Sequence, residues 1–148
     1  MLVLVGPTPL SGIGQVMLKY CALFQTKNYL QYGQQIHPAL RGNILFAFML
    51  PLPAHIQYVK SLQHRFKRVV AMTVCESFPV HKTYGNLASE TQWTWAVPSE
   101  FCRSALTRQF PHWKMSVLRH WVPVPKLLPI AESTDPSIFY TIANDLQH

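Results

Sequence analysis

Short apolar runs alternate with amphipathic stretches along most of the chain. Uninterrupted apolar runs are typical of strands buried on both faces, whereas apolar positions three and four apart are typical of helices. These criteria predict strands at 2–5, 44–50, 69–74, 93–97 and 115–122, with a weaker one within 29–36. They predict helices at 15–24, over the apolar stripe from 52 to 66, behind residue 99, and as a short piece within 81–92. The alternation predicts an α/β fold: a Rossmann-like, doubly wound parallel sheet in three αβα layers.

Two segments between a strand and a helix contain breakers or capping residues. The first, 6–14, is rich in Gly and Pro and is predicted to be a loop that ends in Ser11-Gly12-Ile13-Gly14. In the second, Ser99 follows a proline and precedes Glu100, an arrangement typical of a helix N-cap with an acidic first turn. Arg108 stands where the same helix is expected to end.

The chain is poor in charge for its size. Its 148 residues suffice for one domain, 49% are apolar and only 13% are charged, where about 25% is usual. One explanation is that part of the surface meets a second domain, a partner or a membrane. The other is an ordinary α/β domain with a large buried sheet, and composition leaves both open.

The charges present are mostly positive, with 13 Lys and Arg against 6 Asp and Glu. The tightest cluster, 64–68, is interpreted first as the charged end of a helix. The sequence contains no known nucleic-acid-binding motif, so we expect no nucleic-acid partner. The three cysteines are far apart, so neither a disulfide framework nor a metal site is expected. The start is too short for a signal peptide, and no apolar run approaches the ~18 residues of a membrane span. We therefore expect a cytoplasmic protein, peripheral to a membrane at most.

Glycines behind the first strand are the first candidate for chemistry. Gly12 and Gly14 would let backbone N–H groups approach a phosphate at a helix N-terminus, although a tight turn alone also explains them. The full GxGxxG pattern is absent, and residues 30–40 contain no acidic residue to hold a ribose. A dinucleotide-dependent oxidoreductase is therefore disfavoured, and no cofactor is expected.

Polar residues behind other predicted strands are further candidates, because open parallel sheets bind ligands at their carboxyl edge. Glu76 is separated only by Cys75 from the strand 69–74, and nearby His81 offers an acid, a base or a sugar-hydroxyl partner. The plainer alternative for Glu76 is a loop carboxylate paired with Lys or Arg. Candidates for binding donor phosphate or substrate are Ser11, Gly12, Gly14, His55, Ser99 and His120.

Four segments occur in an order that resembles a known family: 11–14, 72–77, 97–101 and 120–123. The set is similar to the N-terminal half of GT-B-fold glycosyltransferases of the large group 1, retaining family, including versions encoded by large algal DNA viruses. The resemblance implies an acceptor-binding domain at 1–137, with a linker at 123–137, and the first strand of a donor-binding domain at 138–148. It further implies a nucleotide sugar as donor, a glycan or other hydroxyl acceptor, and glycines that approach the donor phosphates.

The sequence departs from that family where many members carry a histidine, at the end of the fourth strand. Cys75-Glu76 stands there, so Glu76 or His81 would have to take the catalytic role. We expect strands 2–5 and 69–74 to be neighbours, so that the reacting sugar lies between Gly12, Gly14 and Glu76. We also expect the chain alone to be inactive and to bind nucleotide sugars weakly. The alternative is a non-catalytic Rossmann-like module that works with a separate subunit.

Overall fold

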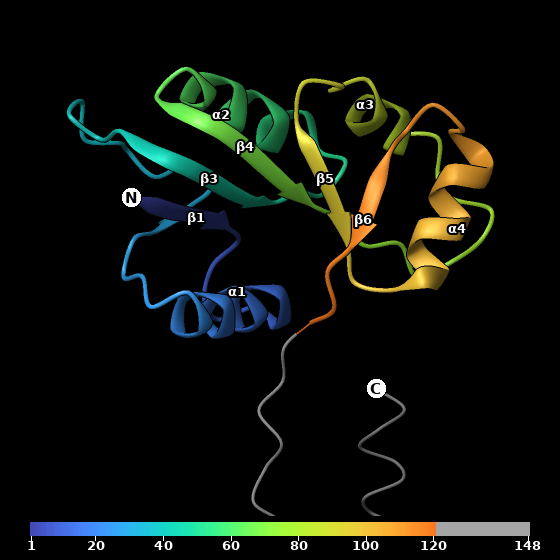
Figure 1. Cartoon of the computed structure of the whole chain (residues 1–148), viewed down its shortest axis with the longest axis horizontal. Coiled ribbons are helices and arrows are strands. Elements are labelled where there is room, and N and C mark those ends of the chain that lie inside the picture. Colours follow the sequence, from blue (N-terminus) through green and yellow to red (C-terminus); the bar gives the residue numbers. More distant parts are fainter. Residues whose placement is uncertain (121–148) are drawn as a thin grey trace, which may run out of the picture.

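A computed structural model describes residues 1–120, which form a six-stranded, all-parallel sheet with helices on both faces (Figure 1). The strands are β1 (Leu2–Gly6), β2 (Tyr29–Gln31), β3 (Gly42–Phe48), β4 (Phe66–Met72), β5 (Thr94–Val97) and β6 (Met115–Val117). The helices are α1 (Gly12–Leu23), α2 (Pro53–Gln63), α3 (Tyr84–Ala88) and α4 (Glu100–Gln109). The predicted Rossmann-like α/β fold with a parallel sheet is confirmed.

The strand order is β2-β1-β3-β4-β5-β6. The order reverses at β1, which pairs with β2 on one side and with β3 on the other. The expectation that β1 and β4 are neighbours is wrong, because β3 pairs with both and lies between them. From Leu45 to Phe48 β3 is buried on both faces, as a central strand must be. The switch point of the fold, where parallel sheets of this class bind ligands, therefore lies between β1 and β3.

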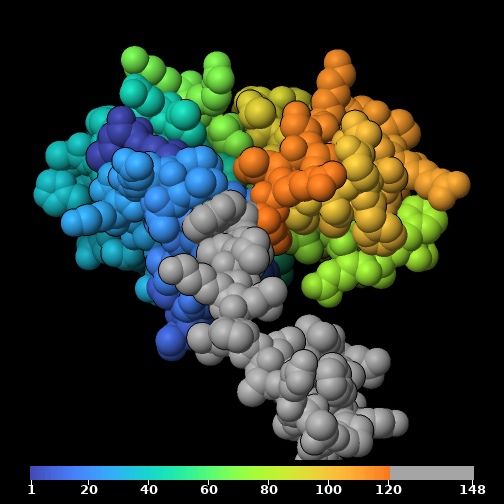
Figure 2. Space-filling view, turned by 60° about the horizontal axis from the view of Figure 1, so that its bottom comes forward, coloured from blue at the N-terminus to red at the C-terminus, as the bar shows by residue number. Residues whose placement is uncertain are grey.

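The two faces of the sheet have separate apolar cores. On one face α1 packs Met17 and Tyr20 against Leu4, Phe46 and Phe48. The opposite core contains the buried residues of α2, α3 and α4. Figure 2 brings the α1 face forward, with α1 in blue and β6 in orange. The result is a three-layer sandwich in which α1 is the only described helix on its face.

Several element boundaries differ from those predicted. Helix α1 begins at Gly12 rather than at 15, because the Ser11 side chain already caps it there. Phe66 does not end a helix but starts β4, since it pairs with Gly42 at the start of β3. Strands β4 and β6 end at Met72 and Val117, earlier than expected. The predicted linker 123–137 and the strand that begins at 138 lie outside the described residues.

Candidate functional site

The loop after β1 brings the start of α1 to the carboxyl edge of the sheet. The Ser11 hydroxyl accepts a hydrogen bond from the Gly14 amide at 2.9 Å and donates one to the Thr8 carbonyl at 2.8 Å. Ser11 is therefore an N-cap whose side chain is already engaged. The amides of Gly12 and Ile13 come too early in the helix for an intrahelical acceptor, and no other acceptor reaches them within residues 1–120. These two N–H groups are the ones open to an anion.

The two glycines of this loop have different structural roles. A Cβ on Gly14 would collide with the carbonyl of Thr8 and lie 2.9 Å from the Cα of Pro9, so the loop folds directly onto the helix there. A Cβ on Gly12 would meet nothing within 4 Å. Gly14 is thus explained by backbone packing alone, whereas Gly12 leaves open space at the helix start.

His55 lies across the switch point, in the first turn of α2 behind β3. Its ring stacks on that of Tyr32, with centroids 3.7 Å apart and an interplanar angle of 4°. The Tyr32 hydroxyl donates to the Phe48 carbonyl at 2.6 Å, and burial raises its pKa. Within residues 1–120 the buried Nδ1 of His55 has no hydrogen-bond partner, and burial lowers the pKa of the ring. The stacked pair is thus held rigidly at the end of β3, with the imidazole favoured in its neutral form.

Glu76 and His81 lie farther along the edge, in the loop between β4 and α3. Both are exposed, and within residues 1–120 no hydrogen bond or ion pair engages the Glu76 carboxylate. His81 Nδ1 lies 2.8 Å from the Thr83 hydroxyl. Because β3 separates β1 from β4, the loop that holds Glu76 is not the direct neighbour of the loop that holds Gly12 and Gly14, as a site between these three residues was expected to require. The catalytic role of Glu76 or His81 stays a prediction.

Ser99 and His120 have defined local surroundings. Ser99 caps α4 as predicted, its hydroxyl accepting from the Cys102 amide at 3.2 Å. His120 lies edge-on to Tyr20 of α1, with ring centroids 6.3 Å apart. Its Nε2 is buried and has no hydrogen-bond partner in the part of the chain that the structure describes, and burial lowers the pKa of its ring. Neither residue joins Gly12 and His55 at the switch point in any contact of the described chain.

The sequence did not single out a set of exposed apolar side chains at the carboxyl edge. They stand in the loops or first turns that follow β1, β3, β4 and β5, and they are Leu10, Leu52, Phe78 and Phe101. Phe78 and Phe101 line a groove of about 580 Å³ on α4, where the Arg108 guanidinium lies 5.3 Å from the centre of the Phe78 ring. Three of the four are next to a proline in the sequence. The proline predicts a loop at these positions but does not indicate that the apolar side chain is exposed.

Neither a metal centre nor a relative helps to assign the site. Within residues 1–120 no group of three or more His, Cys, Asp or Glu side chains is arranged to hold a metal ion. None of the helices in that range is long and apolar enough to cross a membrane. No protein-family model, curated protein or solved structure matches the chain.

Proposed function

We propose that this chain is the acceptor-side, Rossmann-like domain of a two-domain glycosyltransferase that moves a sugar from a nucleotide-sugar donor to a glycan or other hydroxyl acceptor. A second domain, which binds the donor, would face the carboxyl edge of the sheet. The reaction would take place in the cleft between the two domains.

The observation that carries the proposal is the makeup of the carboxyl edge. Parallel strands direct their following loops to this edge, and ligands of such sheets bind there. Here the loops expose four large apolar side chains, two of them on one groove of about 580 Å³. Exposed apolar side chains grouped on one face are typical of a surface that another protein unit covers. An edge that is suited both to a ligand and to a partner domain is what the cleft of a two-domain transferase requires.

The switch point supplies groups suited to the donor. The open amides of Gly12 and Ile13 at the positive end of α1 favour a diphosphate leaving group, whose negative charge grows as the glycosidic bond breaks. The neutral ring of His55, held against Tyr32 on the other side of the switch point, suits a hydrogen bond to a sugar hydroxyl. Both contributions come from backbone or side chains that the fold already fixes.

Glu76 is proposed to act on the sugar or on the acceptor hydroxyl from the loop after β4. Its carboxylate is exposed and unpaired in the described chain, so it is free to accept a proton or to stabilise a cation-like sugar. In the complete enzyme Glu76→Gln should lower kcat by roughly 10²-fold, because it keeps the shape and removes the charge. Unchanged kcat and acceptor KM would pass the assignment to His81.

Amide NMR of the chain during titration with nucleotide sugars tests the binding part of the proposal. UDP- and GDP-linked sugars should shift the Gly12 and Ile13 amides, with dissociation constants on the order of a millimolar, because in this proposal the donor is held mainly by the other domain. NAD serves as the control, and should shift these amides no more than a free nucleotide does. Tight NAD binding, or saturating nucleotide sugar without any shift at the switch point, would contradict the proposal.

The exposed carboxyl edge also suits a non-catalytic module that pairs with a separate subunit, because either partner would cover Phe78 and Phe101. Nucleotide-sugar binding distinguishes the two functions. A pure binding module gives no shift at Gly12 and Ile13, whereas the acceptor-side half of a transferase does.

A further inference from the structure

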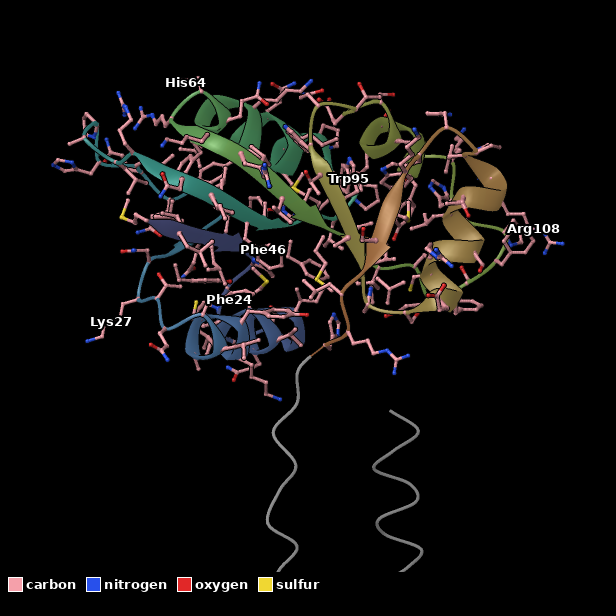
Figure 3. The ribbon with its side chains drawn as sticks, viewed as in Figure 1. Phe24, Lys27, Phe46, His64, Trp95 and Arg108 are labelled. Carbon is pink, nitrogen blue, oxygen red and sulfur yellow. The ribbon has the colours of Figure 1, made fainter. Side chains whose placement is uncertain are left out.

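The amino edge of the sheet, opposite the candidate site, carries a row of basic side chains. They stand just before or within the first residues of four strands and are Lys27, Arg41, Lys67, Arg68 and Lys114. All five are exposed. In Figure 3 Lys27 and His64 lie at the end where β1, β3 and β4 begin, whereas Arg108 lies on α4, at the other side of the molecule. We call these five residues the basic edge.

No free carboxylate of the described chain offsets this charge. Residues 1–120 contain twelve Lys and Arg but only three acidic residues: Glu76, Glu90 and Glu100. Glu90 is bound by Lys60 at 2.6 Å and Glu100 by Arg103 at 2.6 Å, while Glu76 lies on the carboxyl edge. The basic edge therefore has a positive field that is not neutralised from within residues 1–120.

Two shallow grooves run along part of the basic edge. The larger, about 440 Å³, is lined by His64, Lys67 and Arg68 among others, and the smaller, about 300 Å³, by Lys114 and Ser116. The grooves adjoin, since Trp93 and Thr94 line both, and neither is lined by an acidic residue. Together they offer several neighbouring places for anionic groups.

Apolar side chains are exposed among these charges. Ile44 is 36% exposed and pairs with Arg68 across β3 and β4, and Met1, which is 49% exposed, accepts a hydrogen bond from the neighbouring Asn43 amide. Basic residues interspersed with exposed apolar ones are typical of surfaces that rest on anionic lipid. The aromatic rings that line the grooves do not suit nucleic acid, because Phe66, Trp93 and Trp95 are each exposed by 9% or less and cannot stack on a base.

We propose that the basic edge docks the protein on an anionic phospholipid bilayer. Lys67, Arg68 and Lys114 bind lipid phosphates at the two grooves, while Ile44 enters the interface between headgroups. In this orientation the strands run away from the membrane, and the carboxyl edge with its candidate site faces water. The inference rests on the amino edge alone and holds whether or not the chain belongs to a glycosyltransferase.

Vesicle sedimentation with two triple variants of equal net charge tests the inference. The first, Lys67→Gln with Arg68→Gln and Lys114→Gln, removes charge from the basic edge. The control, Lys19→Gln with Lys82→Gln and Arg108→Gln, removes the same charge elsewhere. Wild-type chain and control should bind vesicles of phosphatidylcholine with 30% phosphatidylglycerol and leave pure phosphatidylcholine unbound. The first variant should bind about 100-fold more weakly, because each basic side chain near the surface contributes about 1 kcal/mol.

Ile44→Thr should weaken binding a further several-fold at unchanged charge and should remain folded by circular dichroism, since threonine suits an exposed strand position. Equal losses in the two triple variants would show that net charge alone drives adsorption and would overturn the docking surface. So would absence of binding to the anionic vesicles at 0.1 M salt. Tight binding to single-stranded RNA without vesicle binding would assign the basic edge to another class of partner.

Discussion

Alanine substitutions at Gly12 and Gly14 test which of these two glycines backbone packing requires at the start of α1. In Gly14→Ala the new methyl group would collide with the carbonyl of Thr8, and the obstacle is backbone rather than a side chain that can rotate away. The β1–α1 loop must therefore move and disturb the cap made by Ser11. Overpacking of this kind costs about 1–3 kcal/mol and loss of a cap about 1 kcal/mol, so we expect a loss of roughly 2–4 kcal/mol.

Gly12→Ala is the matched control, because Gly12 lies only two residues before Gly14 and a methyl group on it would meet open space. The free energy of unfolding should change by no more than about 0.5 kcal/mol, with a gain as probable as a loss at a helix start. Urea unfolding followed by circular dichroism measures both variants. With a slope near 2 kcal/mol/M, Gly14→Ala should lower the midpoint by about 1–2 M and Gly12→Ala by less than about 0.3 M. Equal midpoints for the two variants would refute the packing role of Gly14.

Two further predictions concern α4 and the cysteine beside it. Ser99→Ala should lower the free energy of unfolding by about 1 kcal/mol, because the Cys102 amide loses its hydrogen-bond acceptor. Ser104→Ala, on the exposed face of the same helix, should leave that free energy nearly unchanged, and urea unfolding compares the two variants. Burial and the neighbouring Cys102 raise the pKa of the Cys75 thiol to about 12. Iodoacetamide should therefore alkylate Cys75 slowly at pH 7.5 and roughly tenfold faster for each pH unit above that. Mass spectrometry of the Cys75 peptide measures the rate, and fast labelling that does not depend on pH would contradict the prediction.

Local sequence patterns were sufficient for the parts of the fold decided within a few residues. The Pro98-Ser99-Glu100 run predicted the start of α4 correctly, because a cap depends only on the first turn that follows it. The order of the strands in the sheet could not be predicted from local sequence patterns. β3 and β4 have similar apolar runs, and which of them lies beside β1 is decided by pairing between distant segments. Phe66 fitted a helical stripe equally well until its pairing with Gly42 placed it in β4.

For the candidate site, too, local sequence patterns were sufficient for some features, while others depend on contacts between distant segments. The sequence placed Gly12, His55 and Glu76 behind strands, at the carboxyl edge, because strand ends can be predicted and parallel strands share an edge. It did not predict the stacking of Tyr32 on His55, since Tyr32 stands in a segment with little pattern and meets His55 only when β2 and β3 flank β1. The same topology separates Glu76 from Gly12. The proposed site is therefore centred on the loops after β1 and β3, and a contribution of Glu76 from one strand farther along stays a prediction.

The acid sensitivity of the fold should report on the His55–Tyr32 stack. Burial lowers the pKa of His55 in the folded chain below its ordinary value near 6.5, so below that pH the unfolded chain takes up the proton more readily. The folded state therefore keeps its full stability above about pH 6.5 and loses part of it as the pH falls toward the lower folded value. His120 has a pKa lowered for the same reason and adds to the dependence of stability on pH.

His55→Phe keeps a flat ring on Tyr32 and removes both the titrating group and the unpartnered Nδ1. The free energy of unfolding of this variant should therefore depend less on pH between 5 and 7 than that of the wild type. The double variant with His120→Phe should depend less again. If His55→Phe kept the wild-type dependence in urea unfolding over that range, His55 would not be held neutral by the fold, and its proposed hydrogen bond to a sugar hydroxyl would lose its physical basis.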